Sequence, residues 1–151
     1  MGAKDLEARL QSAGLSGDVW GIRGDTSVQN IERELNVTLE PDLRAFVEQV
    51  GNLRVDPFSI ILAGDESGRL SAITETRELW RRTPLLEQLK AIKLTEHAGE
   101  CYIHYPDGSV AAYDSFRPLR GEETLQWRSF REFFDWLFEE AGRISRGHAG
   151  I

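Results

Sequence analysis

Imidazole and thiol side chains are few in this sequence, and their spacing decides which chemistry they could support. The chain has three histidines, His97, His104 and His148, and one cysteine, Cys101. The histidines lack the H-x-x-x-H spacing of zinc ligands, and Cys101 has no second cysteine with which to share a metal ion. We therefore expect no metal site and no cofactor.

Nucleophilic catalysis is equally weakly supported. Cys101 lies near His97 and His104 in the sequence. A thiolate–imidazole pair could form in principle, but a strand cysteine is more often a small packed residue. His104 alternates with Tyr105 on an expected strand, which predicts a surface or interfacial position. Neither a G-x-S-x-G elbow nor a Walker sequence occurs. We predict no catalytic residue and a protein that is not an enzyme, with a small hydrolase or ligand-binding enzyme as the third alternative.

A tryptophan near the C-terminus is the best candidate for binding a partner. On a helical projection Trp136 lies about 60° from Phe133, outside the main apolar stripe, and its neighbours include Glu132, Asp135 and Glu139. A half-exposed tryptophan anchors a protein interface, and nearby carboxylates steer a basic partner towards it. The alternative is that Trp136 only closes the edge of the core.

Two further surface features have competing interpretations. The acidic pair Asp65 and Glu66 lies in an expected turn, where it could contact a partner or simply be solvated. Trp80 precedes Arg81 and Arg82, so it could stack on them or pack inward. We include Asp65 and Glu66 among the candidate partner-binding residues.

Helices dominate the first half of the chain. Apolar residues at helical spacing predict a short helix with Leu6 and Leu10 on one face, and then two longer helices, of which the second begins at Pro41 and ends near Gly51. Several glycines around Trp20 predict a loop held by an aromatic anchor. The expected helices span residues 4–11, 26–36 and 41–50, and the loop spans residues 14–25.

Strands are expected in the middle of the chain. A strand pair is predicted around a turn at residues 64–68, followed by a short helix that ends before Pro84 and one or two more helical turns near Leu86. Three strands then form an antiparallel meander. The expected strands are residues 53–63, 70–73, 91–95, 100–105 and 109–114, and the helix is residues 74–82.

The C-terminal helix is the most strongly predicted element. Ser129 with Glu132 three residues later forms a capping box. At 100° per residue, six apolar side chains after this cap share one stripe, which must face the core. They are Phe130, Phe133, Phe134, Leu137, Phe138 and Ala141.

Composition narrows the class of protein. The chain has 151 residues, of which 40% are hydrophobic and 28% charged, as in an ordinary folded domain. Its net charge of −7 repels phosphate backbones and anionic membranes, so direct nucleic-acid binding is not expected. A single cysteine favours a reducing compartment, and no apolar run approaches the roughly 20 residues of a membrane span. We expect a cytoplasmic protein that has no contact with membranes.

Several short motifs occur in an order that resembles a known superfamily. They are residues 31–35 (IEREL), Leu39 with Pro41, Phe46, Gly51-Asn52, residues 58–62 (FSIIL), Tyr102-Ile103, residues 108–110 (GSV), Tyr113-Asp114 and residues 129–134 (SFREFF). In this order the motifs, which cover about residues 28–141, resemble the SUKH superfamily. This group includes many bacterial toxin-immunity proteins and the fungal Smi/Knr-type regulators of cell-wall synthesis.

The resemblance implies both a fold and a function. The fold would be α+β, with a mixed or mostly antiparallel sheet of about six strands, N-terminal helices, and a C-terminal helix packed on the sheet. We expect an N-terminal extension at residues 1–25, one domain at residues 26–144, and a flexible tail at residues 145–151. The implied function is an immunity protein that neutralises a toxin domain, such as a basic nuclease, by direct binding. The alternative is a housekeeping or regulatory interaction protein without a toxin partner.

Overall fold

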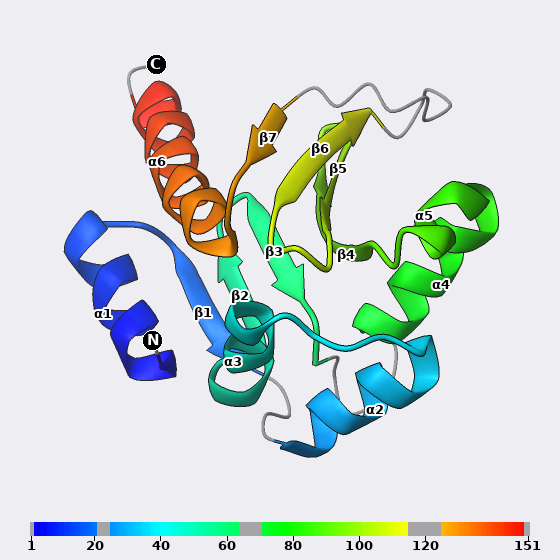
Figure 1. Ribbon diagram of the computed structural model, residues 1–151. Coiled ribbons are helices and arrows are strands. Elements are labelled where there is room, and N and C mark those ends of the chain that lie inside the picture. The colour runs from blue at the N-terminus through cyan, green and yellow to red at the C-terminus, as the bar shows by residue number, and fades with distance from the viewer. Residues whose placement is uncertain (1, 21–24, 64–70, 115–124, 150–151) are drawn as a thin grey trace.

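The chain folds as an α+β protein with two antiparallel sheets (Figure 1). The computed structural model describes residues 2–20, 25–63, 71–114 and 125–149. The helices in these ranges are α1 (Ala3–Ala13), α2 (Asp25–Leu35), α3 (Pro41–Gln49), α4 (Ala72–Arg82), α5 (Pro84–Gln88) and α6 (Phe130–Ala149). The strands are β1 (Gly17–Trp20), β2 (Asn52–Val55), β3 (Phe58–Ile61), β4 (Ile92–His97), β5 (Glu100–His104), β6 (Val110–Asp114) and β7 (Leu125–Trp127).

The strands divide at the boundary between β3 and β4. Strands β1, β2 and β3 form the N-terminal sheet, and β4 to β7 form the meander sheet. We expected one sheet of about six strands; among the described residues no strand pairing joins β3 to β4. The expected α+β class, antiparallel pairing and N- and C-terminal helices are all confirmed.

The predicted loop at residues 14–25 is wrong in its central part, because residues 17–20 form strand β1. This strand pairs with β2, and Arg54 of β2 donates a hydrogen bond from Nε to Asp18 at 2.8 Å. Gly17 is required by this close pairing rather than by a turn, since a Cβ atom there would lie 2.0 Å from the Arg54 carbonyl oxygen. Leu6 and Leu10 of α1, within the expected N-terminal extension, are buried in the same core cluster as the later helices and strands.

The stretch that we expected as one strand, residues 53–63, forms the two paired strands β2 and β3. Strands β2 and β3 are joined by Asp56 and Pro57, which lie between the paired residues Val55 and Phe58. The turn expected at residues 64–68 lies outside the described part of the chain. The strand expected at residues 70–73 is wrong from Ala72 onward, where α4 begins. Ser71 caps this helix, and its Oγ accepts a hydrogen bond from the Thr74 backbone N–H at 3.3 Å.

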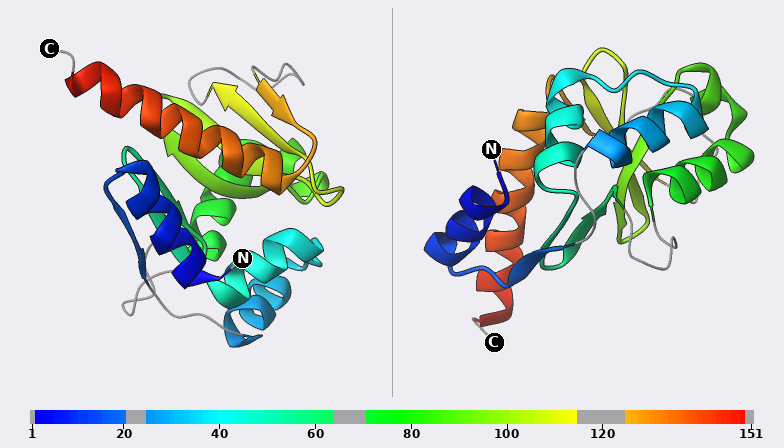
Figure 2. Two further views of the ribbon diagram at one scale, coloured as in Figure 1. Left: turned by 90° about the vertical axis from the view of Figure 1, so that its left-hand side faces the viewer. Right: turned by 90° about the horizontal axis from the view of Figure 1, so that it is seen from below.

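The meander sheet is covered by helices on both faces (Figures 1 and 2). Along β5 the side chains alternate between the two faces. The rings of Tyr102 and His104 face α6, at 5.6 Å from Phe133 and 6.0 Å from Phe130 respectively. Helix α4 packs on the opposite face, where Trp80 points inward and donates from its indole nitrogen to the Ala91 carbonyl at 2.7 Å.

Helix α6 buries the predicted apolar stripe completely. All six of its residues are no more than 6% exposed. The N-terminal cap is also confirmed, because the Ser129 hydroxyl accepts from the Glu132 N–H at 3.1 Å. The helix continues to Ala149, so residues 145–149, which we expected in a flexible tail, are helical. No helix in the described part of the chain is both long and apolar enough to cross a bilayer.

Candidate functional site

Trp136 opens into a surface groove of about 510 Å³, which we call the Trp136 groove. The groove lies between the hairpin that joins β4 to β5 and the middle of α6, with one contribution from β3. Besides Trp136, its main lining residues are Phe58, His97, Glu100, Tyr102, Glu140 and Arg143. The groove therefore combines aromatic surface with two carboxylates.

The aromatic wall of the groove is held from behind by the core. The Trp136 ring centroid lies 4.8 Å from that of Trp127, 5.6 Å from Tyr102 and 5.8 Å from Phe58. These rings come from α6, β7, β5 and β3, so four elements fix the position of one half-buried indole. A side chain fixed in this way loses little conformational entropy when a partner covers it.

Glu100 fixes the phenol of Tyr102 at the groove wall. The Tyr102 hydroxyl donates a hydrogen bond to Glu100 Oε2 at 2.9 Å. Burial, followed by this bond and the negative charges of Glu100 and Glu140, raises the pKa of Tyr102 well above its ordinary value. The phenol therefore stays protonated at neutral pH and acts as a donor.

Glu140 and Arg143 form an ion pair at the rim of the groove. The Arg143 Nε lies 3.2 and 3.1 Å from the two carboxylate oxygens of Glu140. The hydrogen bond from Arg143 lowers the pKa of Glu140. Since the Arg143 side chain is 67% exposed, water screens this pair and its contribution to stability is small.

The structure separates the acidic residues that we grouped with Trp136. The Glu132 carboxylate accepts the Arg128 N–H at 2.9 Å as part of the α6 cap. Asp135 pairs with Arg9 of α1 at 3.1 Å, and Glu139 is exposed. None of these three lines the groove, and Asp65 and Glu66 lie outside the described residues.

Of the groove residues, only Trp136 was among the sequence-based candidates; those missed include His97, Glu100 and Tyr102 of the β4–β5 hairpin. Glu100 and Tyr102 are two apart on β5, which places both side chains on one face, and His97 of β4 stands directly opposite Glu100. That alternation was visible in the sequence. The packing of this face against α6 was not, because it depends on contacts between distant parts of the chain.

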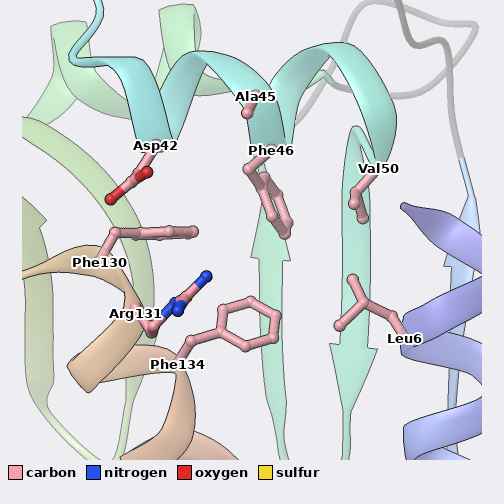
Figure 3. A pocket seen from close by; sticks show the side chains of 8 residues that line it. All are labelled: Leu6, Asp42, Ala45, Phe46, Val50, Phe130, Arg131 and Phe134. Carbon is pink, nitrogen blue, oxygen red and sulfur yellow. The ribbon is translucent and has the colours of Figure 1, made fainter. Parts of the chain in front are cut away.

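A smaller pocket lies where α1, α3 and α6 meet (Figure 3). The rings of Phe46, Phe130 and Phe134 and the side chain of Leu6 converge on it, with Asp42 and Arg131 at its edge. Its volume is about 100 Å³, and its walls belong mainly to the core. This size and lining fit a gap in the helix packing.

A second apolar surface lies on the opposite side of the meander sheet. Leu85 and Leu89 are each 44% exposed and line a depression of about 300 Å³ together with Tyr105, Tyr113 and Gln126. We call this surface the α5 groove. Among its described lining residues the one carboxylate, Asp107, accepts hydrogen bonds from Ser109, so no carboxylate there is hydrogen-bonded to a tyrosine as Glu100 is to Tyr102.

Cys101 is buried, as expected for a small packed residue, and is 2% exposed. Burial raises the pKa of its thiol to about 11, so the thiolate required for nucleophilic attack is rare at neutral pH. Nowhere among the described residues do three or more His, Cys, Asp or Glu side chains gather as a metal site requires.

The predicted surface position of His104 is wrong. This histidine is 2% exposed, and its Nε2 lies 3.3 Å from Oε2 of Glu40, a residue that also caps α3 by accepting the N–H of Asp42 at 3.0 Å. Burial lowers the pKa of His104, although the charge of Glu40 partly opposes this effect. Alternation along β5 places His104 on the same face as Tyr102, which is the face that α6 covers.

The buried His104 predicts a loss of stability in mild acid. Because its pKa is lower in the folded protein than in the unfolded chain, the unfolded chain binds the proton more readily below about pH 6.5. We expect the free energy of unfolding, measured with urea, to fall between pH 7 and pH 5. In His104→Gln this fall should be smaller; an equal fall in both proteins would show that other groups cause it.

Comparison with known proteins supports the fold only. No family model matches the chain, and no curated protein matches it. The crystal structure of a protein from Pseudomonas syringae pv. tomato is similar, with a TM-score of 0.59 over 86% of this chain and 93% of that chain. The two sequences are 13% identical, a level at which the likeness concerns the arrangement of helices and strands.

Proposed function

We propose that this chain is a non-enzymatic protein-binding module that uses the Trp136 groove to neutralise a toxin domain. The observation that carries the proposal is the indole of Trp136, which is half-buried and open to a groove of about 510 Å³. Aromatic side chains that are already fixed in position are typical anchors of protein interfaces.

The charge of the chain favours a basic partner. Its net charge is −7, and the carboxylates of Glu100 and Glu140 stand beside the aromatic wall of the groove. Complementary charge speeds association and selects among partners more than it adds affinity. A basic toxin domain such as a nuclease would meet this surface favourably.

The immunity role is suggested by the motifs that resemble the SUKH superfamily. Those motifs run from the α2 residues 31–35 to the capped start of α6 at residues 129–134. Many proteins of that superfamily bind and block a toxin. An interaction module of this kind needs a rigid surface rather than catalytic groups, which fits the way the core fixes Trp136.

Co-expression with the product of the adjacent gene tests this proposal. If that product is a toxin, it should arrest growth of a bacterial host when expressed alone, and this chain should restore growth and co-purify with it. The matched control is the toxin with its catalytic residue replaced, which should still co-purify. If the two proteins form no complex, the immunity proposal is wrong. If they form a complex without any toxicity, a regulatory partner replaces the toxin.

A further inference from the structure

We infer that the Trp136 groove receives an arginine side chain of the bound protein. This inference rests on the proposed function and names the chemical group that its site recognises. The groove places two carboxylates, Glu100 and Glu140, among the same lining residues as the rings of Trp136 and Tyr102. Aromatic faces and carboxylates together form a site for a cation.

The geometry favours arginine over lysine. A guanidinium is planar, so it can stack on a ring while its edge donates two parallel hydrogen bonds to a carboxylate. Glu100 Oε2 accepts one hydrogen bond from Tyr102, and because each carboxylate oxygen has two acceptor sites, both oxygens can still accept from a guanidinium. A lysine ammonium would reach the same carboxylate as a point charge but would gain no stacking.

The chain already binds one of its own arginines in this way. On another side of α6, the guanidinium carbon of Arg9 lies 4.2 Å from the ring centroid of Phe138, and the same side chain pairs with Asp135 at 3.1 Å. An arginine held between a ring and a carboxylate is therefore an arrangement that this helix supports within the fold.

Arg143 shows that a guanidinium fits at the rim of the groove itself. It contacts both carboxylate oxygens of Glu140, at 3.2 and 3.1 Å, while remaining 67% exposed. An exposed pair of this kind exchanges readily with a competing cation. The negative charges of Glu100 and Glu140 both contribute to the raised pKa of Tyr102, after burial.

Titration with a blocked arginine, N-acetyl-arginine methylamide, tests this inference on the isolated chain. The probe is followed through the indole N–H of Trp136 by two-dimensional NMR, and Trp136→Phe assigns that resonance. We expect a saturable shift with a dissociation constant in the millimolar range. The citrulline analogue, which has the same shape without the charge, should give no saturable shift, and the lysine analogue should bind more weakly.

Variants in the groove should change the affinity for this probe in opposite directions. Glu100→Gln should weaken it about three- to tenfold, because one charged acceptor is lost. Arg143→Gln should strengthen it about two- to fivefold, since Glu140 is released. Arg81→Gln is the matched control, because Arg81 pairs with Glu78 at the same i,i+3 spacing on α4, outside the groove.

The result that overturns the inference is an arginine shift that does not saturate at Trp136, or that equals the citrulline shift, or that Glu100→Gln leaves unchanged. This outcome is independent of the proposed function. If the arginine probe does not bind but the toxin complex still requires Trp136, only the recognised group is wrong. If the probe binds and no protein partner exists, the proposed function is wrong.

Discussion

Trp136→Ala is expected to weaken binding of the proposed toxin partner by about 30-fold or more. This corresponds to the loss of at least about 2 kcal/mol that is typical when a central aromatic anchor is truncated. The loss should be large because the indole is fixed by Trp127, Tyr102 and Phe58 and pays little entropy on binding. The affinity is measured by isothermal titration calorimetry with the purified toxin domain.

The matched control is Trp20→Ala. Trp20 is also half-buried, but it lies at the end of β1 and does not line the groove. We expect this variant to bind the toxin within about twofold of the unaltered chain, since residues outside the central anchor contribute little. Thermal melting of both variants separates a loss of affinity from a loss of folding. Equal losses of affinity in the two folded variants would remove Trp136 from the account.

Phe134→Ala is expected to lower the free energy of unfolding by about 3–5 kcal/mol. The Phe134 side chain is 2% exposed, and its ring centroid lies 5.4 Å from Phe138, 5.7 Å from Phe130 and 6.0 Å from Phe46. Its removal leaves a cavity between α3 and α6 and reduces the apolar surface that folding buries. Urea unfolding followed by circular dichroism measures the change.

Leu85→Ala provides the comparison, because Leu85 is 44% exposed on α5. Its effect on the free energy of unfolding should stay within about 0.5 kcal/mol. If Phe134→Ala does not fold, Phe134→Leu keeps the test open, with an expected loss of about 1–3 kcal/mol for a smaller and differently shaped side chain. A cost below about 1 kcal/mol for Phe134→Ala would contradict the packing described for α6.

Local patterns in the sequence predicted the elements whose signals are local. The apolar period and the cap at Ser129 predicted α6, and Pro41 with the spacing of Leu43, Phe46 and Val47 predicted α3. The short interval between the strands expected at residues 100–105 and 109–114 predicted the antiparallel pairing of β5 with β6. In each case the information lies within a few turns or one hairpin.

Elements that depend on distant pairing were not predicted. Strand β1 begins at a glycine and becomes a strand by pairing with β2, and β7 pairs with β6 across ten residues outside the described part of the chain. The burial of His104 depends likewise on Glu40, a residue 64 positions earlier in the sequence. Such contacts cannot be read from local periodicity.

The candidate site was predicted in part. The helical projection correctly separated Trp136 from the buried stripe, since Trp136 is half-buried while Phe133 is not exposed at all. The acidic neighbours were predicted from the same helix, but Asp135 pairs with α1 and Glu132 caps the helix. The carboxylate that contacts the aromatic wall, Glu100, comes from β5.

Amide hydrogen exchange in a complex with the proposed toxin domain tests the use of the Trp136 groove most directly. Exchange is compared in the chain alone and with saturating toxin domain. We predict slower exchange at residues 97–102 and 136–144, which form the two walls of the groove, and little change around Leu85 and Leu89 of the α5 groove. Protection confined to the α5 groove, with none along the two walls, would contradict the proposed site.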